Sequence, residues 1–391
     1  MFSKLTSLAL VVPLLASIGA SGFPTDKPAD ITSAITSPQY QSPPKAYCGS
    51  MDTSKLVPND PRVKHASAMI RGKTYKYIVG EPQNKSPIDT VVLVHGFPDL
   101  GFGWRYQVPY LMSLGFRVVV PDMLGYAGTA RPDDLNEFSL KNIADDVEAL
   151  ARTFVGDGQI ILGGHDWGGA AIWRVALWHP ELIKAVFSIC TPFVAPKKEF
   201  VPLEKAIAAG HLTNFRYQLQ LRGPEVEEKI QGEEKIRQFI SAIHGGVGVG
   251  RKKAFTVDKG VNFDELPGME NSTTLPKEEL DYYVQQYMLQ DAPQLRGPLN
   301  WYRTMKINFD DELQLADKNT TLNMPALYIG ATKDTALPPS MSAGMDQYLP
   351  NLSRGEVESS HWAPTEAAAD VNRQIGSWLD GVLNGAIKSA L

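Results

Sequence analysis

Short apolar runs recur along the chain, and most of them are separated by stretches long enough to form a helix. They occupy residues 90–94, 116–120, 159–162, 185–189 and 326–329. Runs that are apolar on both faces and alternate with helices are typical of a mostly parallel sheet covered by helices. Two segments of alternating polarity around Arg71-Gly72 predict an antiparallel hairpin before the first of these strands.

The same patterns divide the chain into five parts. Residues 1–22 have the pattern of a signal peptide, and residues 23–61, which contain seven prolines, are predicted to form a proline-rich N-terminal arm. Residues 62–195 and 316–391 carry the apolar runs, so we expect them to form the two parts of one α/β core. Between them, residues 196–315 contain helical, charged and glycine-rich sequence, which predicts an inserted, mainly helical cap.

The segment GGHDWGGA at residues 163–170 follows one of the apolar runs and leads into a helical pattern, AAIWRVALWH. It has the spacing of a nucleophile elbow, a sharp turn between strand and helix that exposes one side chain, here Asp166. Gly164 and Gly168 suit such a turn because it leaves no room for nearby Cβ atoms. Alternatively, Asp166 caps the helix, since aspartate is a favoured N-cap residue.

Other groups of a hydrolytic site occur in the chain order that such an elbow requires. Asp334 follows the last apolar run, and His361 precedes the closing helix. We therefore expect a site in which Asp166 is the nucleophile, His361 is the general base and Asp334 orients the histidine. Glu358 is a weaker candidate for the orienting acid.

Backbone donors for this site are also predicted. The sequence HGFP follows the run at 90–94, so the N–H of Phe97 and that of Trp167, just after the candidate nucleophile, can converge on one oxygen. These two N–H groups form the predicted oxyanion hole. The side chains of the same two residues are the predicted substrate contacts.

Several long segments resemble one known family. HGFPDLGFGWRYQVPYL, GGHDWGGAAIWRVALWHPE and ATKDTALPPSMSAGMDQYLP are similar to segments of the α/β-hydrolase-fold epoxide hydrolases, above all to the catalytic domain of the soluble type. The resemblance covers about residues 63–379 and implies a mostly parallel eight-stranded sheet flanked by helices, with an inserted helical cap. It also implies that two cap tyrosines, Tyr217 and Tyr302, hold the epoxide oxygen.

The resemblance predicts a hydrolase that opens an epoxide to a vicinal diol through a covalent aspartyl ester. An epoxide is attacked at a saturated carbon, and a carboxylate, with an ordinary pKa of about 4, is already ionised at neutral pH. The first step therefore needs no base. The expected partners are a small epoxide and water. No cofactor or metal ion is expected, and no pair of cysteines or histidines has metal-ligand spacing.

Two other functions fit parts of the pattern. A haloalkane dehalogenase shares the aspartate nucleophile, and Trp167 could hold a halide through its indole N–H, but Phe97 offers no second side-chain donor. The tyrosine pair favours an oxygen leaving group instead. A non-catalytic secreted binding protein of the same fold is the other alternative, since a fold alone does not establish activity.

Two positions depart from the family pattern. Ala127 stands in GYAGT where a second glycine is usual, and Ser360 precedes His361 where glycine is common. Neither change removes a reacting group, so we expect altered loops around an intact set of reacting side chains.

The composition is that of a globular protein and disfavours one class of partner. The chain has 391 residues, 43% of them apolar and 21% charged, and its net charge of −5 gives no indication of a nucleic-acid-binding surface. Two cysteines are present. Cys190 ends an apolar run, as expected for a buried thiol, and a bridge to Cys48 is the alternative.

The N-terminal residues predict export. Lys4 precedes an apolar stretch at residues 8–16 and then small residues up to Gly22, which is typical of a cleaved secretory signal peptide. That stretch is shorter than the ~20 residues that a membrane-spanning helix needs, and no later segment is apolar for long enough. Four Asn-X-Ser/Thr triplets are consistent with a secreted glycoprotein, at Asn84, Asn271, Asn319 and Asn351.

Overall fold

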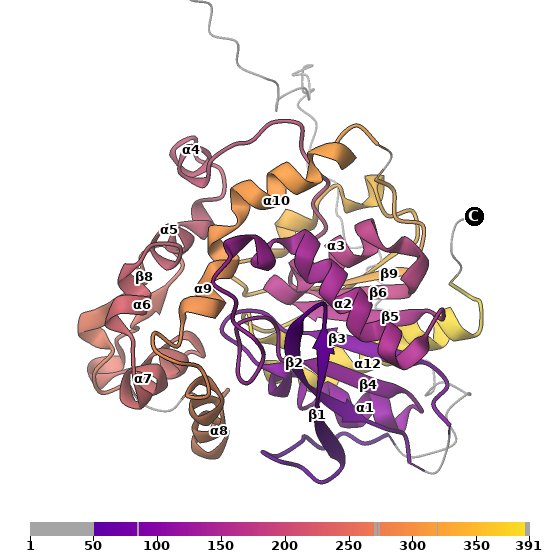
Figure 1. The fold of residues 1–391 in the computed structure, drawn as a ribbon, viewed down its shortest axis with the longest axis horizontal. Coiled ribbons are helices and arrows are strands. Elements are labelled where there is room, and N and C mark those ends of the chain that lie inside the picture. Colours follow the sequence, from indigo (N-terminus) through magenta and orange to yellow (C-terminus); the bar gives the residue numbers. More distant parts are fainter. Residues whose placement is uncertain (1–50, 84–85, 270–271, 273, 319, 388–391) are drawn as a thin grey trace, which may run out of the picture. The chain divides into compact units, whose positions relative to one another are not determined.

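The computed structural model describes residues 51–83, 86–269, 272, 274–318 and 320–387. An eight-stranded sheet with the strand order β1-β2-β4-β3-β5-β6-β9-β10 runs through them (Figure 1). The strands are β1 (Val63–Ile70), β2 (Lys73–Gly80), β3 (Thr90–Val94), β4 (Arg117–Pro121), β5 (Ile160–His165), β6 (Ile183–Ile189), β9 (Ala326–Ala331) and β10 (Leu352–Val357). Only the β1–β2 and β2–β4 pairs of this sheet are antiparallel, so the predicted mostly parallel sheet is confirmed.

The predicted hairpin is also present, as β1 and β2. Arg71 and Gly72 connect the two strands with positive φ angles of 45° and 80°. Two-residue hairpin loops favour this backbone conformation because its twist matches that of the flanking strands.

Helices cover the sheet and bury its central strands. α2 (Leu140–Val155) and α3 (Trp167–Trp178) pack against each other and against β3 and β5, while α1 (Gln107–Ser113) packs with α12 (Ala368–Leu383). Every residue of β3, β5 and β9 is buried, which explains why the sequence of these strands is apolar on both faces. The short helix α11 (Ala363–Glu366) precedes α12.

The chain between β6 and β9 forms a mainly helical insertion, which we call the cap. Its elements are α4 (Leu203–Ala208), α5 (Tyr217–Leu221), α6 (Glu225–Lys229), α7 (Glu233–Ile243), β7 (Phe255–Thr256), β8 (Gly260–Val261), α8 (Lys277–Tyr287), α9 (Arg296–Arg303) and α10 (Met305–Glu312). In Figure 1, α5 to α8 lie to one side of the large sheet. The cap boundaries at 196 and 315 remain predictions, and the small β7–β8 sheet was not predicted.

A buried ion pair joins the cap to the core. Nε of Arg105 lies 2.8 Å from Oε2 of Glu279 in α8, and these side chains are only 3% and 5% exposed. Replacing Glu279 with glutamine would leave the buried guanidinium without its charged partner. We therefore expect Glu279→Gln to lower the free energy of unfolding by about 3 kcal/mol, measured by urea denaturation.

The control for this prediction is Glu278→Gln, which removes an exposed carboxylate one residue earlier in the same helix. It should leave the urea midpoint almost unchanged, since exposed charges contribute little to stability. Equal midpoints for the two variants would contradict a stabilising role of the buried pair.

Several predictions concern residues outside the described ranges. These are the signal peptide at 1–22, the arm up to residue 50, Cys48, and the triplets at Asn84, Asn271 and Asn319. Cys190 is buried and forms no disulfide within the described part of the chain. Among the helices of that part, none is both long and apolar enough to span a bilayer.

Candidate active site

Four strands end at one edge of the sheet, and each is followed by a predicted site residue. Phe97 follows β3, Asp166 follows β5, Asp334 follows β9 and His361 follows β10. These strands are parallel to one another, so their carboxyl ends share an edge, which is where sites of open α/β sheets form. The structure brings all four residues together there.

Asp166 occupies a strained turn between β5 and α3. Its backbone has φ 54° and ψ −126°, a conformation that costs an ordinary residue free energy and that clusters at functional sites. Cβ atoms on Gly164 or Gly168 would overlap neighbouring backbone atoms, as predicted for a nucleophile elbow. The sequence therefore forms the elbow because glycines permit the close backbone crossing around it.

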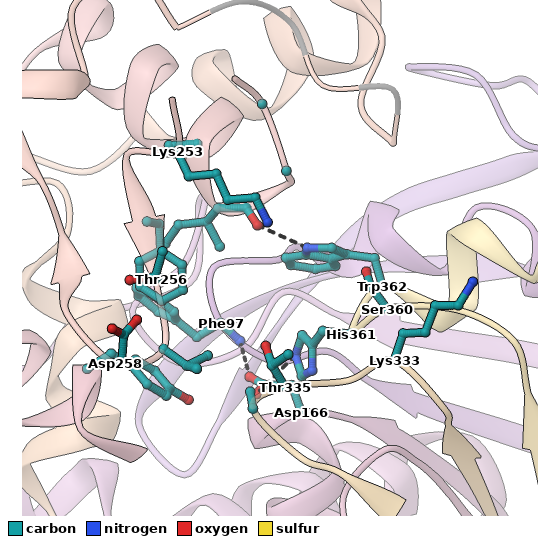
Figure 2. A pocket seen from close by; sticks show the side chains of 18 of the residues that line it. Phe97, Asp166, Lys253, Thr256, Asp258, Lys333, Thr335, Ser360, His361 and Trp362 are labelled. Carbon is teal, nitrogen blue, oxygen red and sulfur yellow. Dashed lines mark hydrogen bonds and ion pairs between the residues drawn. The ribbon is translucent and has the colours of Figure 1, made fainter. Parts of the chain in front are cut away.

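The carboxylate of Asp166 does not cap α3, although the residue stands at the N-cap position. Instead, its Oδ1 accepts a hydrogen bond of 2.7 Å from the backbone N–H of Phe97, and its Oδ2 lies 3.5 Å from Nε2 of His361. A Cβ on Gly96 would overlap both this carboxylate and the backbone nitrogen of Trp167. The backbone nitrogen of Trp167 and the carboxylate thus both lie beside Gly96, and Figure 2 shows the bond between the Phe97 N–H and that carboxylate.

His361 is oriented by Asp334. Nδ1 of the imidazole lies 2.7 Å from Oδ2 of Asp334, whose other oxygen accepts the backbone N–H groups of Ala336 and Leu337. The rival acid, Glu358, is 79% exposed in its side chain and pairs with Lys333 rather than with the imidazole. The geometry therefore favours Asp334 as the partner of His361.

The charges of these groups are coupled. Burial lowers the pKa of His361, but the carboxylates of Asp334 and Asp166 outweigh burial and raise it well above its ordinary value. Burial raises the pKa of Asp166, yet contacts with His361 and with the Phe97 N–H bring it below its ordinary value. The pKa of Asp334 is also lowered, because His361 outweighs its burial. The raised pKa of the imidazole and the lowered pKa values of the two carboxylates each favour the charged form of the group.

Ser360, one of the two departures from the family pattern, has a structural role. Its backbone N–H and its hydroxyl both donate to the carboxylate of Glu366 in α11, each at 2.7 Å. A glycine could make only the first of these bonds. The serine therefore fixes the loop that carries His361 to α11.

A cavity of about 390 Å³ opens above the carboxylate of Asp166. Tyr217 of α5 and Tyr302 of α9 line it from the cap, and Phe97 and His361 line it from the core. The ring centroids of the two tyrosines are 6.3 Å apart, and the ring of Tyr302 meets that of Phe97 edge-on at 5.0 Å. The predicted tyrosine pair and the predicted nucleophile therefore face the same space.

The two phenols are suited to donate hydrogen bonds. Burial raises the pKa of Tyr217, and the negative charge of Asp166 raises it further. Burial raises the pKa of Tyr302 well above its ordinary value, and Tyr217 and Asp166 add to this effect. Both side chains are therefore protonated and neutral at pH 7.

Trp167 is not among the residues that line this cavity in the described part of the chain, and a substrate contact by its side chain stays a prediction. Its ring packs edge-on against Tyr302, with centroids 5.2 Å apart, and against Trp301 at 6.3 Å. The indole therefore packs beside Tyr302, which is part of the cavity wall.

Much of the cavity wall was not predicted from the sequence. Part of it comes from residues 245–258 around β7, including Lys253, Phe255, Thr256 and Asp258 (Figure 2). This glycine-rich and charged segment has no sustained apolar period, so its position beside the site could not be predicted from local pattern. Trp362 also lines the cavity. Its position directly after His361 in the sequence is the feature that could have indicated this.

The structure also gathers potential metal ligands that their sequence spacing does not indicate. Ligand atoms of His165, Cys190 and His361 lie within 4.8 Å of one another. However, Nε2 of His165 is bonded to the carbonyl of His361 at 2.7 Å, and Nδ1 of His361 is bonded to Asp334. These two bonds hold the loop and the imidazole of His361 in place, and they account for the proximity of the two histidines.

Comparisons with known proteins identify the family of this chain. Residues 89–368 match the family model described as "alpha/beta hydrolase fold". "Epoxide hydrolase srdG" of Neurospora crassa is 40% identical over 347 residues, which cover 85% of this chain and 100% of that protein. "Bifunctional epoxide hydrolase 2" of Rattus norvegicus is 34% identical over 297 residues, covering 74% of this chain and 51%, about half, of the rat protein.

Solved structures of epoxide hydrolases have the same fold. VrEH1 from Vigna radiata superposes with a TM-score of 0.68 at 25% identity, covering 81% of this chain and 98% of that chain. Epoxide Hydrolase A from Mycobacterium thermoresistibile gives a TM-score of 0.68 at 25% identity, over 82% of this chain and 98% of that chain. The predicted fold and the predicted family are confirmed. The chain belongs to the α/β-hydrolase family and, within it, to the epoxide hydrolases.

Proposed function

We propose that this epoxide hydrolase works through a covalent ester on Asp166, which His361 and Asp334 then help water to hydrolyse. The observation that carries the proposal is the position of the Asp166 carboxylate. It lies at the base of the cavity, bonded to a backbone N–H on one side and 3.5 Å from the imidazole on the other. Two neutral phenols line the same cavity.

In the first step, a carboxylate oxygen of Asp166 attacks a ring carbon, and the carbon–oxygen bond of the epoxide breaks. Negative charge develops on the leaving oxygen, where Tyr217 and Tyr302 donate hydrogen bonds and one of them transfers its proton. The products are an ester on Asp166, a free hydroxyl group on the substrate and a tyrosinate. Because the phenols have raised pKa values, that tyrosinate is a strong base.

Ester formation also changes the protonation of His361. The negative charge of Asp166 is one cause of the raised pKa of His361, and the neutral ester removes it. The pKa of His361 therefore falls, and the imidazolium proton returns to the tyrosinate by way of solvent. This transfer leaves a neutral imidazole beside the ester, as base catalysis requires.

In the second step, neutral His361 takes a proton from water, and the resulting hydroxide attacks the ester carbonyl. The N–H groups of Phe97 and Trp167 stabilise the oxyanion. Collapse of the tetrahedral intermediate breaks the ester bond, and the leaving alkoxide takes the proton of the hydroxyl group that was added to Asp166, by way of His361, so that the diol is released. Asp166 is again a carboxylate, and His361 again holds a proton, so the starting state is restored.

The dehalogenase alternative is weaker. The comparisons reported above name epoxide hydrolases. A halide site built on Trp167 would also need a second side-chain donor, and Phe97, which lines the cavity beside Asp166, has none. Assaying a chloroalkane beside styrene oxide separates the two activities. Faster turnover of the chloroalkane would reject the epoxide assignment.

Oxygen-18 water tests the covalent mechanism. In one turnover with enzyme in excess, the attacking water oxygen enters the carboxylate of Asp166, and the diol receives the unlabelled carboxylate oxygen. We therefore expect mass analysis to find the label in the peptide that contains Asp166. Label that enters the diol directly in that first turnover would show that water attacks the epoxide itself and would overturn the proposal.

The tyrosine pair gives a further prediction. Tyr302→Phe and Tyr217→Phe each remove one donor to the leaving oxygen, so each should slow ester formation on the order of 100-fold, measured by single-turnover kinetics. Tyr282→Phe is the matched control, because Tyr282 is buried but does not line the cavity. Unchanged ester formation in both active-site variants would exclude the phenols as proton donors.

We also propose that the chain enters the secretory pathway. The support is the basic, apolar and small-residue pattern of residues 1–22. Sequencing the N-terminus of the protein purified from its natural source should find a start between Ser21 and Phe23. A mature protein that still begins at Met1 would contradict export through this signal.

A further inference from the structure

We propose that Trp362, together with His244, positions the loop that carries His361 by tying it to the cap. Activation of water by His361 would then depend on the position of the cap relative to the loop that carries this histidine. The inference rests on the function proposed above, because it concerns the second step of that reaction. It assigns a positioning role to two residues that take no part in bond making.

Trp362 directly follows His361 and contacts the cap in two ways. Its indole N–H donates to the carbonyl of Ile243 at the end of α7, at 3.1 Å, which is the dashed line at Trp362 in Figure 2. Its ring also stacks on His244, with centroids 3.9 Å apart and planes inclined by 17°. Together, a directional hydrogen bond and a stacked face fix both the distance and the orientation of the ring.

His244 is itself held firmly within the cap. Its Nδ1 lies 2.9 Å from the carbonyl oxygen of Ile240, which can only accept, so Nδ1 carries the hydrogen. The carbonyl of His244 accepts from the hydroxyls of Ser272 and Thr274. Burial lowers the pKa of His244 to about 3, so the stacked ring is neutral. Trp362 therefore rests on a well-anchored and uncharged surface.

On the core side, the same loop is attached at two further points. Nε2 of His165 donates to the carbonyl of His361 at 2.7 Å, and Ser360 is bonded to Glu366. Burial lowers the pKa of His165 to about 4, so this donor is also a neutral imidazole. These bonds hold the loop to β5 and α11, whereas the Trp362 contact joins it to α7.

The contact connects groups that serve different steps. The cap carries Tyr217 and Tyr302, which assist ester formation, while His361 acts in ester hydrolysis. A displacement of about 1 Å in a reacting group can cost on the order of 100-fold in rate. Losing the contact between Trp362 and the cap should therefore slow hydrolysis of the ester much more than its formation.

The test compares the two steps in Trp362→Phe, which retains an aromatic ring but has no indole N–H. Single turnovers of styrene oxide with excess enzyme are quenched over time, and intact-mass analysis follows the ester. We expect hydrolysis to slow by about tenfold to 100-fold, with formation nearly unchanged, so that the ester accumulates. His244→Leu, which removes the stacked ring and leaves Trp362 intact, should show the same selective loss.

Trp378→Phe is the matched control. Trp378 is buried in α12 and does not line the cavity, and its indole nitrogen has no hydrogen-bond partner among the described residues. Both rates should be unchanged in this variant.

A folded Trp362→Phe enzyme with unchanged hydrolysis, or with equal losses in both steps, would overturn the inference alone. If Trp362→Phe does not fold, His244→Leu decides by the same criterion. If the native enzyme forms no ester at all, the proposed function fails first and the inference with it.

Discussion

Asp166→Ala is expected to form no measurable diol, a loss on the order of 10⁴-fold or more in turnover. The carboxylate makes the bond to the substrate, and no other carboxylate in the described cavity wall lies between the oxyanion donors and His361. Alanine removes the nucleophile and leaves the glycines of the elbow in place. Diol formation is measured by chromatography, and circular dichroism checks that the variant is folded.

Asp157→Ala is the control for this substitution. Asp157 is exposed in the turn before β5 and is not among the cavity-lining residues. Its variant should retain native turnover. If Asp166→Ala kept turnover within about tenfold of the native enzyme, which is roughly 1.4 kcal/mol in activation free energy, Asp166 could not be the nucleophile.

His361→Gln is expected to form the ester and then stop. The nucleophile remains, so the epoxide is still opened, but no base activates water, and hydrolysis should slow on the order of 10³-fold. Intact-mass analysis should therefore detect a protein heavier by the mass of one substrate molecule. Peptide mapping should place this added mass on Asp166.

His211→Gln is the matched control, because His211 is exposed in the cap and does not line the cavity. It should show neither an accumulated ester nor a slower turnover. If His361→Gln were inactive with no trapped ester, the histidine would be needed already for the first step. The assignment of ester formation to Asp166 alone and of ester hydrolysis to His361 would then be wrong.

Much of the architecture could be predicted because the informative signals are local. The central strands are buried on both faces, so β3, β5, β6 and β9 are visible as apolar runs. The elbow around Asp166 is set by nearby glycines, and the chain order of Asp334 and His361 follows from the order of the strands that precede them.

Other elements leave little trace in the sequence. Strand β10, with the sequence LSRGEV, lies at an edge of the sheet and is only partly buried, so it has no apolar run. Strands β7 and β8 have two residues each, too few for a period to be recognised. A pairing such as Trp362 with His244 joins segments more than a hundred residues apart, and only tertiary packing determines it.

Aromatic residues illustrate the same limit. Trp104, Phe193, Trp301 and Trp362 are all large aromatic residues, but only Trp362 of these lines the described cavity. The other three are buried in the core. A large aromatic side chain is expected in either place, since both are largely apolar.

The cap is a single insertion between β6 and β9, and this has a consequence for the evolution of such enzymes. These strands are hydrogen-bonded neighbours, so the sheet is complete without the segment that separates them in the chain. Lengthening such a connection costs only ~0.6 kcal/mol for each doubling. Changes within this one segment of the chain can therefore alter the cavity walls that select among epoxides. Asp166 and His361 lie outside the segment and stay unchanged.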